Sequence, residues 1–332
     1  MFARRFASAG IALALLAPGE ASAAQRPDLV QVSVSRPPQN VAAGMSFTIR
    51  DKVKNKGDRK ASKSTTAYYL SLDRKRSNND LKLGRRKVPR LGPGDASRGS
   101  RLVIVPSDAP LGRFYVLACA DANKAVPEKD ESNNCRSAET RVRVRAPTCR
   151  EQLFLLEMDF SNGPQTVGID NPVTVHPPIA GVAFTNFKQI LNADIKMDCR
   201  LALRLHQMAT GLVTLGIDEV EQWGVYNYRC ISGQGTPPDC PTGVSQHAYG
   251  MAIDLASFSG DTTYVVEDHW TPDFNTDTCT QTTTSVEHLF LRDLVCSWAE
   301  DDLFNIILTP NYNADHHNHI HVDLTPGANF ID

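Results

Sequence analysis

The net charge of this chain changes sign near residue 147, and this change limits the possible folds more than any other sequence feature. Residues 24–147 contain 26 Lys and Arg against 12 Asp and Glu, whereas residues 148–332 contain 7 against 24. Such asymmetry predicts two domains, and 332 residues are enough for each half to bury its own core. The basic half could attract an anionic polymer or dock on the acidic half.

The N-terminus has the features of a signal peptide. Arg4 and Arg5 precede a short apolar stretch at residues 11–17 and the small residues 21–23, so we expect residues 1–23 to be cleaved. The stretch is shorter than the roughly 20 residues that span a bilayer, and we expect no membrane span. With no cysteine near the cleavage site, we expect no lipid anchor. The sequence therefore predicts a secreted, periplasmic or extracellular protein.

The eight cysteines predict disulfides rather than a zinc cluster. Their number is even, the chain is predicted to be exported, and it contains no CxxC pair. Any metal would then have to be bound by His, Asp or Glu side chains.

Residues 27–146 have the pattern of short strands separated by turns. The strands include "LVQVSVS", "MSFTIRDKV", "TAYYLSL" and "RFYVLACA", and the turns include "NKGD" and "GPGD". This spacing predicts an all-β, immunoglobulin-like sandwich. The segments "VKNKGDRKA", "PLGRFYVLACAD" and "AVPEKDESNNC" resemble the cell-adhesion-related domain found in bacteria, CARDB. Cys119 and Cys135 flank the last predicted hairpin, so we expect them to pair.

After a linker at residues 145–149, the pattern becomes α+β. The segments "CRLALRLHQMATGLVTLG" and "VEHLFLRDLVCSWAE" have helical spacing, and "VEQWGVYNYRC", "MAIDLASF" and "LFNIILTP" are typical of strands. For residues 148–332 we expect an α+β domain with a small antiparallel sheet. We expect Cys149 to pair with Cys199, and we leave open the pairing of Cys230, Cys240, Cys279 and Cys296.

The stretch "HHNHIHVDL", residues 316–324, holds four of the nine histidines within six positions. Strand alternation places His319, His321 and Asp323 on one face, opposite Ile320 and Val322. An exposed polar strand face is the simplest interpretation of a single histidine. Solvated faces are usually populated by Lys, Glu and Thr, however, so the cluster favours a row of ligands.

A second stretch, "SQHAYGMAIDLASF", places His247 and Asp254 seven residues apart. Asp254 lies between Ile253 and Leu255 on a strand that we predict to be buried, where an unpaired carboxylate is costly. A bound cation would offset this cost, although a turn or an arginine partner would also do so. Two imidazoles and one carboxylate with an open fourth position are typical of catalytic zinc, and these ligand types favour zinc over calcium or magnesium.

These motifs also resemble known families. "SQHAYGMAID" with a later "HIH" resembles the lysostaphin, D-Ala-D-Ala metallopeptidase and hedgehog superfamily, which implies a zinc-peptidase-like fold. "YNYRC" and "ILTPNYNADHHNHIHVDL" are similar to the bacterial extensin-like C-terminal domain. The resemblance implies that His247, Asp254 and His321 bind zinc and that His319 is the catalytic histidine. It also implies that Arg229 binds a substrate carboxylate or carbonyl group.

One position departs from the related D-Ala-D-Ala peptidases. Their general base is a carboxylate three residues before the last zinc ligand, and here that position is Asn318. Because an amide is not a useful base, we assign the role to His319, with His316, Asp315 or the loss of the base as alternatives. His316 could also orient a ligand imidazole, and Ser245 is a turn position of the first motif.

The signal-peptide and ligand patterns predict a secreted zinc protein, and the resemblance implies a metallopeptidase of D,D-carboxypeptidase or endopeptidase type. We expect it to hydrolyse amide bonds of peptidoglycan stem peptides or cross-bridges. The basic sandwich would bind peptidoglycan or another anionic wall polymer, and we expect no nucleic acid partner. The alternatives are a catalytically silent, zinc-containing binding or adhesion protein of the cell envelope, and a structural envelope protein without a metal.

Overall fold

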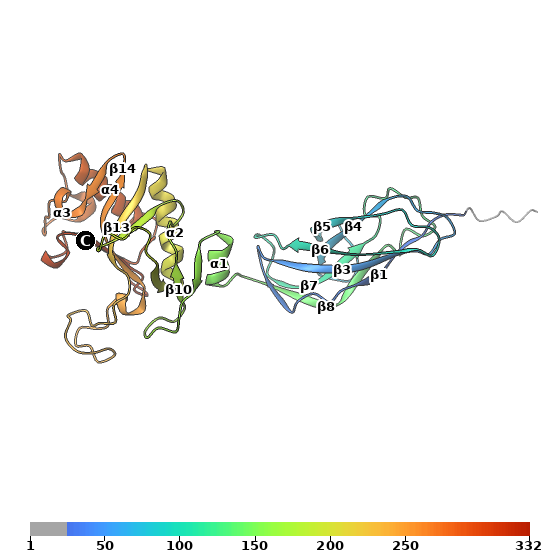
Figure 1. Ribbon diagram of the computed structural model, residues 1–332, viewed down its shortest axis with the longest axis horizontal. Helices are drawn as coiled ribbons and strands as arrows, with labels where there is room; N and C mark the ends of the chain where they lie inside the picture. The colour runs from blue at the N-terminus through green and yellow to red at the C-terminus, as the bar shows by residue number, and fades with distance from the viewer. Residues whose placement is uncertain (1–24) are drawn as a thin grey trace, which may run out of the picture. The chain divides into compact units, whose positions relative to one another are not determined.

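A computed structural model of the chain describes residues 25–332 (Figure 1). The chain divides into two compact units between Arg145 and Ala146, within the predicted linker. The predicted signal peptide, residues 1–23, lies outside the described residues. Among residues 25–332, no helix is long and apolar enough to cross a membrane.

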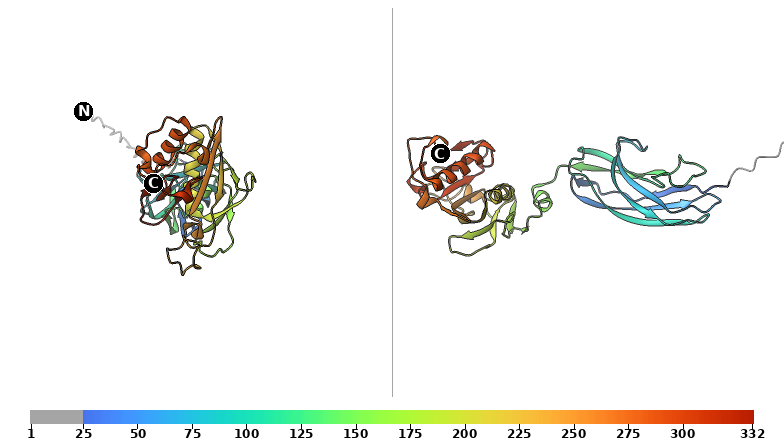
Figure 2. Two further views of the ribbon diagram at one scale, coloured as in Figure 1. Left: turned by 90° about the vertical axis from the view of Figure 1, so that its left-hand side faces the viewer. Right: turned by 90° about the horizontal axis from the view of Figure 1, so that it is seen from above.

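The N-terminal unit is a sandwich of two β-sheets (Figure 2). One sheet has the strand order β1 (Leu29–Val34), β3 (Ser46–Asn55) and β6 (Ala96–Ile104). The other has the order β2 (Asn40–Ala42), β8 (Cys135–Arg145), β7 (Gly112–Cys119), β4 (Ser64–Ser71) and β5 (Leu81–Val88). Alternate apolar residues of both sheets form the core, including Ile49, Tyr68, Val103, Val116 and Val142. The predicted all-β fold of this half is thus confirmed.

The C-terminal unit contains a larger sheet than we predicted. Its seven strands have the order β11 (Ala183–Asn186), β13 (Ile217–Gly224), β14 (Ala252–Gly260), β17 (Ile320–Asp323), β16 (Ile306–Leu308) and β18 (Phe330–Ile331), with β15 (Thr263–Val265) also paired to β14. The predicted small antiparallel sheet is correct only for its centre, because β11 is parallel to β13 and β18 is parallel to β16. These edge strands are two to four residues long, too short to produce a readable alternation.

A second, three-stranded sheet has the order β12 (Ile195–Asp198), β10 (Pro172–Val175) and β9 (Phe160–Asn162). The helices are α1 (Cys149–Leu155), α2 (Cys199–Thr214), α3 (Val266–His269) and α4 (Val286–Glu300). Three short 3₁₀ helices are η1 (Gln246–Tyr249), η2 (Thr278–Thr280) and η3 (Ala314–His316).

The apolar faces of α2 and α4 position the central strands. Leu205 of α2 and Leu291 of α4 belong to the same buried cluster as Ile253, Ile320 and Val322. Burial of apolar side chains is the main favourable contribution to folding, so this packing fixes which way β14 and β17 face. Their other face is then free to carry polar side chains.

All eight cysteines form disulfides. Cys119 pairs with Cys135 and Cys149 with Cys199, as expected, and the sequence had left open the pairs Cys230–Cys240 and Cys279–Cys296. Cys149 and Cys199 begin α1 and α2, so their bond ties the two helices together. Four disulfides fit a protein of an oxidising, extracellular or cell-surface environment.

Candidate metal centre

Strand register brings Asp254 and His321 together. β14 and β17 are antiparallel neighbours, and Asp254 lies directly opposite His321. Side chains of directly opposed residues lie on the same face of a sheet and contact each other. The alternate residues Ile253 and Ile320 are fully buried on the opposite, core face, so both polar side chains point away from the core.

A tight turn brings His247 to the same place. His247 lies in η1, whose N-cap Ser245 accepts a hydrogen bond from the His247 N–H through its Oγ. Gly250 ends η1 with a φ of +62°, and a Cβ there would lie 2.9 Å from the Ile169 Cδ1 atom. The positive φ and the Asp198 backbone nitrogen, 3.0 Å from such a Cβ, strongly favour glycine in the turn that leads the chain from His247 into β14.

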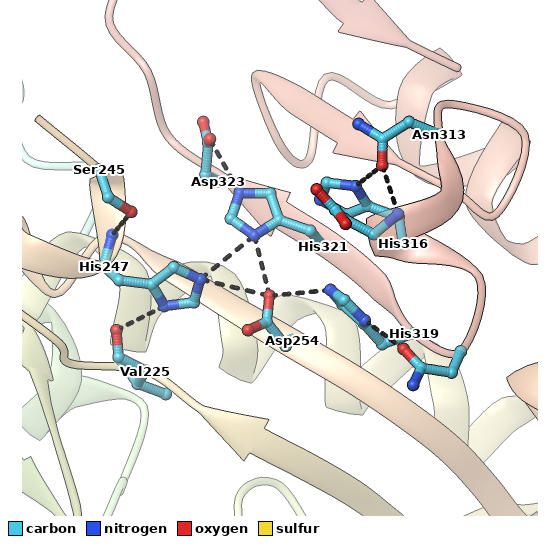
Figure 3. Close-up of polar contacts among 11 residues, drawn as sticks. Val225, Ser245, His247, Asp254, Asn313, His316, His319, His321 and Asp323 are labelled. Atoms are coloured by element: carbon cyan, nitrogen blue, oxygen red, sulfur yellow. Dashed lines mark hydrogen bonds and ion pairs between the residues drawn. The ribbon is translucent and has the colours of Figure 1, made fainter. Parts of the chain in front are cut away.

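Three side-chain atoms converge at this point (Figure 3). The Asp254 Oδ1 atom lies 3.2 Å from the His247 Nε2 atom and 2.9 Å from the His321 Nδ1 atom. The two imidazole nitrogens are 3.3 Å apart. A tetrahedral zinc ion with bonds of about 2.0–2.1 Å would separate its ligand atoms by roughly 3.3 Å. The side chains of His247, Asp254 and His321, called the three-donor cluster below, therefore fit a metal ion of this kind.

The outer nitrogens of both imidazoles have acceptor partners. His247 Nδ1 is 3.0 Å from the Val225 carbonyl oxygen, and His321 Nε2 is 3.1 Å from Asp323 Oδ2. A carbonyl oxygen and a carboxylate oxygen accept hydrogen bonds, so these contacts would keep the outer N–H groups in place when a metal ion takes the position of the inner protons and binds the inner nitrogens. This is the usual arrangement behind a metal-bound imidazole.

Electrostatics also favour a cation in the cluster. Burial raises the pKa of Asp254, but hydrogen bonds with His247 and His321 outweigh it and hold this pKa below its usual range. Burial lowers the pKa of His321, whereas the carboxylates of Asp254 and Asp323 raise it to about 9. The carboxylates thus hold a positive charge between the strands, which a bound metal could replace.

His319 lies beside the cluster and is not one of its converging donors. Its Nε2 atom is 3.7 Å from Asp254 Oδ1, and its Nδ1 atom is 2.9 Å from the Asn318 Oδ1 atom. If Asn318 Oδ1 accepts the Nδ1 proton, the lone pair is on Nε2 and faces the cluster. Burial lowers the pKa of His319, which favours the neutral imidazole. His319 can therefore accept a proton from a group bound next to the cluster.

The other predicted site residues lie at different distances from the centre. The His316 ring lies 5.1 Å from that of His319, and burial lowers the pKa of His316 to about 4. The Arg229 backbone carbonyl accepts a hydrogen bond from the Ser245 N–H. The Arg229 side chain is exposed and has no hydrogen bond or ion pair with any of residues 25–332, so it is near the motif but not in the cluster.

Sequence reasoning missed three contributors. Alternation placed Asp323 on the correct face, but nothing in the sequence assigned it to His321. The Val225 carbonyl is a backbone group and has no sequence signature. Trp223 has its ring centroid 5.7 Å from that of His319 and forms part of the wall beside it. In the sequence, Trp223 was only one apolar residue of an expected strand, "VEQWGVYNYRC".

The fold and the cluster define a two-unit protein with a β-sandwich and an α+β unit that carries a histidine–aspartate candidate metal centre. Comparison with family models agrees with this organisation. The model "Extensin-like protein C-terminus" matches residues 133–330, and the model CARDB matches residues 26–138. The first match covers more than half of the chain, so the protein belongs to the extensin-like C-terminal family. The CARDB resemblance of the N-terminal half is also confirmed.

Solved structures similar to the chain include a CARDB domain from Pyrococcus furiosus, determined in complex with di-metal ions. It is 20% identical, and the match covers 38% of this chain and 100% of that one with a TM-score of 0.28. A β-glucosidase from Erythrobacter marinus is 14% identical over 36% of this chain and 16% of that chain, with a TM-score of 0.25. No curated protein matches the sequence.

Proposed function

We propose that the protein is a zinc-dependent peptidase that hydrolyses amide bonds of peptidoglycan stem peptides or cross-bridges. The observation that carries the proposal is the convergence of His247 Nε2, Asp254 Oδ1 and His321 Nδ1 within 3.3 Å, with acceptors behind both imidazoles. Three protein donors of these types leave one position of a tetrahedral zinc ion open, which is the arrangement of a catalytic site.

When bound there, zinc would acidify a water molecule and polarise the scissile carbonyl group. His319 would accept the proton of the attacking water at Nε2, because that atom faces the cluster and the pKa of His319 is lowered. Asn318 would be a positioning residue that holds the His319 ring through the contact of 2.9 Å. In this proposal, Asn318 occupies the position of the general base in D-Ala-D-Ala peptidases, but it only orients the base, which is His319.

The proposed substrate rests on the resemblance to peptidases and on which charged side chains near the cluster are free to bind a ligand. The exposed Arg229 guanidinium has no partner among residues 25–332, and it could bind the carboxylate of a stem peptide. Asp254 and Asp323 are both engaged by imidazoles. Within the described residues the cluster therefore does not provide two free carboxylates, the usual acid and nucleophile of a glycosidase.

The proposal can be tested by mass spectrometry of purified muropeptides. We expect the zinc-loaded, full-length protein to release an amino acid or a peptide, and the chelated protein and the His247→Ala variant to release none. The mass of the product identifies the bond and separates carboxypeptidase from endopeptidase activity. Bound zinc without release from monomeric and cross-linked muropeptides would contradict the proposal and favour the catalytically silent binding protein.

A further inference from the structure

The outer face of the five-stranded sheet carries a group of arginines. On β8, Val142 and Val144 are buried in the sandwich core, so the alternate residues Arg141 and Arg143 point outward and are exposed. On the adjacent β7, Phe114 and Val116 are buried, so Arg113 and Tyr115 point outward. We call Arg113, Tyr115, Arg141 and Arg143 the arginine face; β7 and β8 are labelled in Figure 1.

Register brings like charges together on this face. Arg113 lies directly opposite Arg143, and Tyr115 lies directly opposite Arg141. Like charges in directly opposed positions destabilise a sheet. Neither Arg113 nor Arg143 has a carboxylate partner among residues 25–332, whereas the exposed Arg36 pairs with Glu139 at 2.7 Å. The opposed pair Arg113 and Arg143 therefore does not stabilise the fold, and a bound anion would offset the repulsion between the two guanidinium groups.

The arginine face also includes an aromatic ring that contacts two arginines, and it borders a hollow. The guanidinium carbons of Arg74 and Arg141 lie 4.6 Å and 4.5 Å from the centroid of the Tyr115 ring, which restrains both side chains. Beside them is a hollow of about 480 Å³ lined by Gln39, Asn40, Arg113, Thr140, Arg141 and Arg143. The lining thus combines three guanidinium groups with amide and hydroxyl groups, and it contains no carboxylate.

We propose that the arginine face binds an acidic polysaccharide through its carboxylate groups. Guanidinium groups bind carboxylates through two parallel hydrogen bonds, and their exposed position leaves these donors available. Gln39, Asn40 and Thr140 supply the neutral donors and acceptors that sugar hydroxyls require. Four disulfides fit an environment outside the cytoplasm, and a surface polysaccharide is a ligand of that environment. The proposal concerns the N-terminal unit and does not depend on the metal centre.

The test measures binding of the full-length protein to immobilised polygalacturonate, with dextran as the neutral polymer. We expect binding to polygalacturonate that weakens with salt, and none to dextran. The Arg113→Gln/Arg143→Gln variant should bind at least about ten-fold more weakly, because one hydrogen bond to a charged group contributes on the order of a factor of ten. Its midpoint of thermal unfolding should not fall, since the variant removes a repulsive pair.

The matched control is Lys60→Gln/Arg90→Gln, which removes the same charge from two exposed loop positions outside the sheet. Its affinity for polygalacturonate should stay close to that of the unchanged protein. Equal weakening in both double variants would overturn the proposal, because net charge alone would then explain binding. Tighter binding to polyphosphate, DNA or anionic vesicles than to polygalacturonate would overturn the choice of an acidic polysaccharide.

Discussion

Asp254→Ala is expected to abolish stoichiometric zinc binding. The Asp254 carboxylate lies within 3.2 Å of both imidazole nitrogens and is the only anion among the three converging donors. Its removal leaves only two imidazole ligands, which are too few for a stable catalytic site. We expect elemental analysis after zinc loading and gel filtration to find about one zinc per chain in the unchanged protein and almost none in the variant.

Two further variants make this prediction sharper. Asp315→Ala removes an exposed aspartate close to the histidine stretch and should leave the zinc content unchanged. Asp323→Ala removes the acceptor behind His321 and should weaken zinc binding by roughly 10–100-fold, the usual effect of losing a partner behind a ligand. Full zinc content in Asp254→Ala would show that the ion lies elsewhere.

His319→Ala is expected to lower the rate of muropeptide hydrolysis by about 10²–10⁴-fold, the usual contribution of a general base. Zinc content should be retained, because His319 Nε2 lies 3.7 Å from Asp254 Oδ1 and is not among the converging donors. The readout is the initial rate of product release, measured with elemental analysis of the same sample. An unchanged rate in this zinc-loaded variant would remove His319 from the mechanism.

Asn318 provides a second test of the same idea. Asn318→Asp keeps an oxygen that can accept the Nδ1 proton of His319, so this variant should retain most of the activity. Asn318→Leu has a similar size but no acceptor, and its rate should fall while its zinc content stays constant. Equal rates in the two variants would mean that the contact of 2.9 Å does not position His319.

Much of the candidate site could be predicted because it lies on two short strands. In "AIDL" and "HIHVDL", one alternate set of residues is apolar, so the period of two identifies the polar set that faces the other way. The structure has this alternation, with Ile253, Ile320 and Val322 fully buried. His247 lies outside both strands, and the resemblance to metallopeptidases, not the alternation, placed it with them.

Other features could not be predicted because they depend on tertiary contacts. Helix α4 was expected from "VEHLFLRDLVCSWAE", but the first apolar residue of this segment, Val286, is 70% exposed, whereas Leu291 and Leu294 lie in the core. A helical pattern with apolar residues on several sides does not define which side is buried. Likewise, the Val225 carbonyl contacts His247 only because the fold brings two separate segments together. The contact between Asn318 and His319 depends on the conformation of the loop before β17.

The central claim is that His247, Asp254 and His321 hold a zinc ion with one position open. An anomalous difference map at the zinc absorption edge, from a crystal of the zinc-loaded full-length protein, tests it most directly. We expect one peak about 2.0–2.2 Å from His247 Nε2, Asp254 Oδ1 and His321 Nδ1, with a further light ligand on the open side. A map with no peak there, while these side chains keep their direct contacts with one another, would contradict it.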